Sequence, residues 1–215
     1  MTGKLTLYGA QGFGSVAVEA ALTLLGEPYE SIDLPADSPQ AFLAAAKAVN
    51  PMLQVPALVL PSGELMTESA AILIWLADRH GRLAPAPTDP RRAQFLRWMV
   101  YVPAAIYSMY WVRDEPSRLA ATPEAEEVIK ERTAERIADC WRIMDEQVQP
   151  GRYILGDELS VLDLYVTVVS RWTPRRRRFY EAAPKLGEVV RRVDAEPRLA
   201  ALWAERFPFA EGWEG

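Results

Sequence analysis

Hydrophobic and polar positions follow two different patterns along the chain, and the pattern changes near residue 85. Before that point, short apolar runs with alternating faces predict strands, and longer runs with helical spacing lie between them. Two of the strands flank Ser62-Gly63, which is typical of a hairpin turn. The predicted elements, in chain order, cover residues 5–8, 16–25, 28–33, 42–49, 57–60, 64–67 and 69–79. Their order is β-α-β-α-β-β-α, with an early right-handed parallel crossover and an antiparallel edge added by the hairpin.

Beyond residue 85 the chain shows helical spacing with brief breaks at prolines and no convincing strand. A proline-rich segment separates the two patterns, which predicts an α/β domain at 1–82, a linker at 83–91 and an all-α domain at 92–215. The fold class is therefore α/β plus all-α.

Composition narrows the classes of protein that the chain can represent. Half of the 215 residues are hydrophobic and a quarter are charged, which is typical of a globular protein and not of a disordered one. The net charge of -5 disfavours a dedicated nucleic-acid binder. One cysteine, Cys140, and one histidine, His80, exclude a disulfide framework and disfavour a metal site. With no signal-peptide layout and no apolar run as long as a membrane span, we expect a cytoplasmic protein without a membrane partner.

Three motifs give the chain a resemblance to a known family. They are Asn50-Pro-Met-Leu-Gln-Val-Pro-Ala-Leu58, Glu68-Ser-Ala-Ala-Ile72 and Tyr153-Ile-Leu-Gly-Asp-Glu-Leu-Ser-Val-Leu-Asp163. In order and spacing they resemble the glutathione S-transferase family, and the resemblance covers essentially the whole chain. It implies a thioredoxin-like first domain, a homodimer, glutathione as co-substrate and a role in detoxification. The third motif predicts a structural capping box, in which Ser160 and Asp163 satisfy backbone donors of a helix.

The first two motifs supply the expected glutathione-binding residues. The family implies a cis bond between Val55 and Pro56, with the main chain of Val55 free to pair with the cysteinyl backbone and Gln54 assisting. Ser69 begins a helix whose amides suit the α-carboxylate of the γ-glutamyl group, and Glu68 suits its ammonium group. The simpler alternatives are a plain turn at Val55 and a helix cap at Glu68 and Ser69.

Activation of the glutathione thiol requires a group that stabilises the thiolate, and the sequence offers several candidates. A free thiol has a pKa of ~8.5, and lowering it by ~1.5 units requires about 2 kcal/mol of thiolate stabilisation. Ser15, after the glycine-rich loop, is the first candidate for the activating hydroxyl, and Tyr8 is the alternative. The third possibility is a backbone amide or another group of the loop. No cysteine precedes residue 86, which disfavours mixed-disulfide chemistry. Glu19 departs from the basic residue that the family usually carries nearby.

An aromatic stretch around Pro103, which we expect to interrupt its helix, suggests an apolar or aromatic electrophile. Core packing or dimer contact would explain the same residues. The expected electrophile pocket consists of Phe13, Tyr107, Tyr110 and Trp111.

The arginine-rich segment 171–178 is interpreted as a solvated or salt-bridged helix face with glutamates between 124 and 135 as partners, or else as a site for a carboxylate-bearing substrate. The expected activity is conjugation of glutathione to a small electrophile. The alternatives are a glutathione-dependent isomerase or peroxidase, and a non-catalytic glutathione-binding or interaction protein.

Overall fold

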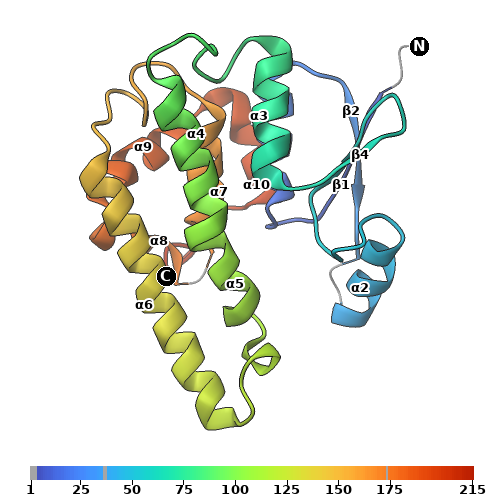
Figure 1. Ribbon diagram of the computed structural model, residues 1–215, viewed down its shortest axis with the longest axis vertical. Helices are drawn as coiled ribbons and strands as arrows, with labels where there is room; N and C mark the ends of the chain where they lie inside the picture. Colours follow the sequence, from blue (N-terminus) through green and yellow to red (C-terminus); the bar gives the residue numbers. More distant parts are fainter. Residues whose placement is uncertain (1–3, 36–37, 173) are drawn as a thin grey trace.

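The first half of the chain is built on a four-stranded mixed sheet in the order β2-β1-β3-β4. The structure is a computed structural model that describes residues 4–35, 38–172 and 174–215 (Figure 1). β1 (Leu5–Gly9) runs parallel to β2 (Tyr29–Asp33) and antiparallel to β3 (Ala57–Val59), which pairs in turn with β4 (Leu65–Met66). The predicted parallel crossover and antiparallel hairpin edge are confirmed.

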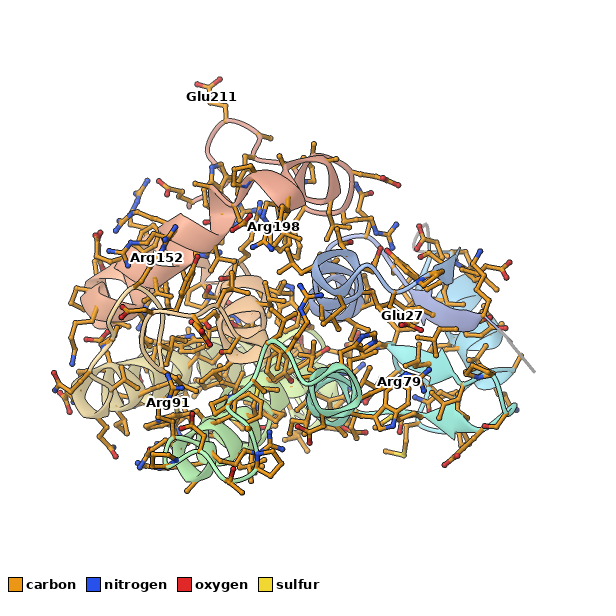
Figure 2. All side chains as sticks on the ribbon, turned by 90° about the horizontal axis from the view of Figure 1, so that it is seen from above. Glu27, Arg79, Arg91, Arg152, Arg198 and Glu211 are labelled. Atoms are coloured by element: carbon orange, nitrogen blue, oxygen red, sulfur yellow. The ribbon has the colours of Figure 1, made fainter. Side chains whose placement is uncertain are left out.

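Helices cover both faces of the sheet, and each face has its own apolar cluster. α1 (Ser15–Leu25) and α3 (Ser69–His80) lie between the sheet and the second half of the chain, as Figure 2 shows from above. Almost every side chain of α1 is buried, because its outer face packs against a helix of the second half. Gly26 ends α1 in the left-handed conformation, as predicted.

α2 (Pro39–Lys47) packs on the other face of the sheet through the smaller cluster. It begins three residues before the predicted start at Phe42 because Ser38 caps it, with the Ser38 hydroxyl accepting a hydrogen bond from the Ala41 amide at 3.2 Å. Pro39 fits the first helical position, where no amide donor is needed.

The second half of the chain is helical, as predicted, and in the described residues its single β-type pairing is a bridge between Tyr153 and Gly156. α7 is buried on all sides and packs against α1 and α9. Figure 1 shows the long α6 beside α4 and α5. The helices are α4 (Arg92–Tyr101), α5 (Ser108–Arg113), α6 (Pro123–Gln147), α7 (Val161–Val169), α8 (Arg175–Ala182), α9 (Pro184–Asp194) and α10 (Ala200–Arg206), with 3-10 turns at Pro116–Arg118 and Pro197–Leu199.

A π-helical segment, Val102–Tyr107, joins α4 to α5. Pro103 has no amide hydrogen to donate, so the regular hydrogen-bond ladder of an α-helix is broken at this point. The predicted interruption at Pro103 is therefore present, and it directs Tyr107 toward the first domain.

The predicted capping box at the start of α7 is confirmed. Asp163 accepts hydrogen bonds from the amides of Ile154 and Ser160, both at 2.8 Å, and from the Ser160 hydroxyl at 2.7 Å. Complete burial raises the pKa of Asp163 to about 6, against the opposing effect of these hydrogen bonds. The carboxylate joins the loop before α7 to the helix itself.

The described residues contain neither a candidate membrane span nor a candidate metal site. No helix there has both the length and the apolar character needed to cross a bilayer. In the same residues, no group of three or more His, Cys, Asp or Glu side chains is arranged to hold a metal ion.

Candidate functional site

The head of α3 brings together a carboxylate and a set of backbone amides. Glu68 is the N-cap residue and has φ 65°, a left-handed conformation that non-glycine residues rarely adopt. Among the residues that the structure describes, no side chain caps the helix, so the first-turn amides, beginning with Ser69, face outward. The Ser69 hydroxyl is buried and lies 2.9 Å from the hydroxyl of Tyr165 on α7. This end of α3 is therefore fixed against the second domain, while the Glu68 side chain remains exposed.

A second segment presents main-chain groups just before β3. The Val55–Pro56 bond is cis, as the family resemblance implied. In the described part of the chain, neither the amide nor the carbonyl of Val55 has a hydrogen-bond partner. Sequence reasoning missed the residue that shapes this loop, the buried Asn50, whose side chain donates to the Gln54 carbonyl at 2.8 Å and accepts from the Met52 amide at 2.9 Å. The signal was present in the Asn-Pro pair, which is typical of turns.

The loop between β1 and α1 is closed by Ser15. Its fully buried hydroxyl donates to the Ala10 carbonyl and accepts from the Ala10 amide, both at 3.2 Å. A Cβ atom on Gly9 would lie 2.6 Å from the Ser15 Oγ, so this arrangement needs glycine at position 9. Gly14, not Ser15, is the N-cap of α1, and no side chain caps it. The role of Ser15 as thiol activator stays a prediction.

Tyr8, the alternative candidate, closes β1 on the face covered by α2. Together with Phe42 and Leu53, it packs against the small cluster of Leu34, Ala46 and Val55. Its catalytic role likewise stays a prediction.

The second domain holds the same loop from outside. The Gly12 amide donates to the Arg206 carbonyl at 2.9 Å, and the Gln11 side chain donates to the Glu205 carbonyl at 2.7 Å. The Trp172 indole donates to the Gly12 carbonyl at 2.8 Å. These contacts join residues far apart in the sequence, so no local pattern could have indicated them.

Glu19, the acidic departure in the first helix, is paired with Arg206 of α10. The guanidinium lies 3.0 and 3.1 Å from one Glu19 carboxylate oxygen and also contacts Asp33 at 2.5 and 2.6 Å. Burial raises the pKa of Glu19 to about 7, and Arg206 opposes this effect. The hydrogen bonds from Arg206 lower the pKa of Asp33. The positive charge beside the first helix is therefore supplied by the second domain.

The four residues predicted to line an electrophile pocket differ in exposure, and their shared role stays a prediction. Phe13 is 39% exposed and stacks on Phe42, with ring centroids 5.5 Å apart. Trp111 is 48% exposed, with a guanidinium over its ring. Tyr110 is buried in the core of the second domain. Tyr107 is half-buried and lies beside Gly14.

The arginine-rich segment is divided between the surface and the interior: Arg175 and Arg177 are exposed, as expected of a solvated helix face, whereas Arg171 and Arg176 are buried. Arg176 is fully buried and pairs with Asp194 at 2.7 Å, and Arg171 lies beneath Phe207, Phe209 and other aromatic side chains of the C-terminal segment. Burial lowers the pKa of Arg171 to about 10. The prediction that glutamates of α6 pair with the arginine-rich segment was wrong for Arg176. Two of these glutamates form ion pairs with basic residues of α6 itself.

Comparison with known proteins identifies the family. Residues 15–79 match the glutathione S-transferase N-terminal domain, and residues 114–206 match the glutathione S-transferase C-terminal domain. The uncharacterized GST-like protein YncG of Escherichia coli strain K12 is 32% identical over 196 residues, which are 91% of this chain and 95% of that protein. The chain belongs to the glutathione S-transferase family.

Two solved structures with glutathione share the fold. A glutathione transferase homologue from Sulfitobacter with bound glutathione gives a TM-score of 0.77 at 28% identity, covering 93% of this chain and 96% of that one. A sphingomonad glutathione S-transferase complexed with glutathione gives a TM-score of 0.73 at 25% identity, covering 92% of this chain and 96% of that one.

Proposed function

We propose that this protein binds glutathione and activates its thiol for attack on a small, mainly apolar electrophile. The observation that carries the proposal is the head of α3, where the exposed carboxylate of Glu68 and the uncapped amides of the first turn share one helix end. Amides at a helix N-terminus favour an anion, and a carboxylate favours a cation. Together they suit the zwitterionic γ-glutamyl end of glutathione.

The other predicted contacts follow along the tripeptide. The unpaired amide and carbonyl of Val55 suit the cysteinyl backbone, with Gln54 and Pro56 beside them. The thiol then points toward the head of α1, where helix amides favour a thiolate over a thiol. Ser15 is the hydroxyl proposed from the sequence, with Tyr8 as the alternative.

The second substrate is proposed to lie between the loop before α1 and the helix α5. Phe13 and Trp111 present exposed aromatic surface from these two elements. The paired exposed apolar residues Leu96 and Val100 on α4 support the homodimer that the family resemblance implied.

Glutathione binding is tested by calorimetric titration of wild type and Glu68→Gln. Loss of one charge-assisted contact of about 1.5–3 kcal/mol raises the Kd about 10- to 150-fold. Glu64→Gln is the matched control, since Glu64 is exposed in the nearby hairpin. The Glu64→Gln variant should bind glutathione with the wild-type affinity.

A glutathione analogue that lacks the γ-glutamyl ammonium tests directly whether Glu68 contacts that group. Wild type should bind it as weakly as Glu68→Gln binds glutathione, and Glu68→Gln should hardly distinguish the two ligands. Wild type that binds neither ligand contradicts the proposed function.

A non-catalytic glutathione-binding protein is the second candidate, favoured by the internal hydrogen bonds of the Ser15 hydroxyl. Turnover against a panel of aryl halides, epoxides and enones separates the candidates. Binding without turnover on any of them would favour the second.

A further inference from the structure

A hydroxyl from the second domain lies at the head of α1, where the proposed function requires a donor to the sulfur. A Cβ atom on Gly14 would lie 2.6 Å from the Tyr107 Oη, so this hydroxyl occupies the space of the missing side chain. Gly14 has an ordinary helical conformation, with φ -62°. Glycine at this position is therefore explained by the approach of Tyr107 and not by the backbone.

Neither Ser15 nor Gly14 supplies a hydroxyl to this place. The Ser15 hydroxyl points back to Ala10, and Gly14 has no side chain. The Tyr107 hydroxyl makes no hydrogen bond within the described parts of the chain. A half-buried phenol without a partner, beside uncapped helix amides, is a donor available to a ligand.

Neighbouring side chains hold the Tyr107 ring in position. Its centroid lies 4.7 Å from the Trp172 ring, whose indole donates to the Gly12 carbonyl in the same loop. On the other side, the Tyr165 ring lies 6.5 Å away and its hydroxyl contacts Ser69 at the head of α3. Tyr107 is thus fixed between the two helix ends that the proposed function assigns to the γ-glutamyl group and to the sulfur of glutathione.

We propose that Tyr107 donates the hydrogen bond that stabilises the glutathione thiolate, whereas Ser15 closes the loop on which the sulfur rests. This inference rests on the proposed function. The thiol proton leaves to water, and the phenol keeps its own proton and acts as a neutral donor. Burial and the negative charges of Glu68 and Asp114 all raise the pKa of Tyr107, which keeps the phenol protonated throughout the neutral range.

The test measures the thiolate absorbance of bound glutathione against pH in wild type, Tyr107→Phe and Ser15→Ala. We expect the bound thiol pKa to rise by about one unit in Tyr107→Phe, which leaves about tenfold less thiolate at neutral pH. Ser15→Ala should keep the wild-type pKa. The acid limb of the kcat/KM profile should shift with the thiol pKa in Tyr107→Phe.

Tyr101→Phe is the matched control. The Tyr101 hydroxyl donates to the Cys140 carbonyl at 3.0 Å inside the second domain, so its loss removes a phenol hydrogen bond without changing the bound thiol. A structural effect of Tyr→Phe changes in this helix would appear in both variants.

Gly14→Ala is an independent variant that moves the Tyr107 phenol without removing it from the protein. The added methyl group displaces the Tyr107 hydroxyl, and we expect the same rise in thiol pKa. Adding Gly14→Ala to Tyr107→Phe should then produce little further rise, because the displaced hydroxyl is already gone.

Failure of the Tyr107 role and failure of glutathione binding give different results. An unchanged thiol pKa in Tyr107→Phe, or a rise confined to Ser15→Ala, overturns the role of Tyr107 while glutathione binding stands. Wild type that does not bind glutathione overturns the proposed function and this inference with it.

Discussion

Replacing Arg206 with methionine should be among the most destabilising single changes in this protein. The Arg206 side chain is 7% exposed, and it faces Glu19 at 3% exposure and the half-exposed Asp33. Methionine preserves much of the buried volume but leaves the Glu19 carboxylate without its cation. Breaking a buried ion pair by removing one partner costs about 3–5 kcal/mol, a large share of the 5–15 kcal/mol typical of a folded domain.

The destabilisation by Arg206→Met comes mainly from the loss of the interaction between Arg206 and Glu19. A double-mutant cycle can isolate the free energy of this interaction. Glu19→Gln alone keeps the contact between Arg206 and Asp33, and should cost about 1–3 kcal/mol. The double variant contains no unpaired buried carboxylate at position 19, so its cost should fall below the sum of the two single changes by about 0.5–3 kcal/mol.

Urea unfolding followed by circular dichroism measures these free energies. The experiment is best run at about pH 8, one unit above the pKa of Glu19 of about 7, where the carboxylate is ionised. Arg198→Met is the control, because Arg198 pairs with Glu196 at 2.7 Å but is 59% exposed (labelled in Figure 2). Its cost should stay within about 0.5 kcal/mol. Equal costs for the two arginine variants, or strict additivity in the cycle, would refute the reasoning.

Three further predictions concern the cap, the pH dependence and the assembly. Ser160→Ala should lower the free energy of unfolding by about 0.5–2 kcal/mol in the same urea assay, and no change would contradict the capping role. The pKa values of Glu19 and Asp163 are raised from 4.5 and 3.8 to about 7 and about 6, so the native state holds protons that the unfolded chain has released. Their contribution to stability is therefore full below about pH 4 and lost as the pH rises through 6 and 7, which urea midpoints across that range should show relative to Glu19→Gln. Leu96→Glu combined with Val100→Glu should convert a dimer to a monomer in light scattering, whereas a dimer that survives both charges would place the interface elsewhere.

Local patterns in the sequence were enough to predict most of the fold. The alternation at 5–8, the hairpin at Ser62-Gly63 and the capping box of Ser160 all arise from residues within one turn or one strand, so their physics is visible in a short window. The start of α2 was wrong by three residues because the apolar spacing outweighed the cap at Ser38.

The direction of site side chains could not be predicted in the same way. Ser15 is at the expected end of α1, but its hydroxyl is turned by the close approach of Gly9, which only the folded loop reveals. Glu19 looked anomalous because its partner Arg206 is 187 residues away in the sequence. The approach of Tyr107 to Gly14 could not be predicted, since helical spacing does not show how closely a helix approaches a neighbouring domain.

The hydrogen bonds between α10 and the loop before α1 have a consequence for synthesis of the chain. Gln11 and Glu205 are 194 residues apart, so this loop emerges from the ribosome long before the helix that holds it in place. The sheet can form early from its own strands, but a nascent or truncated chain without α10 lacks these anchors. Assembly of the proposed sulfur-binding end of the site is thereby coupled to docking of the two domains, and partial chains should carry the fold of the first domain without its finished loop.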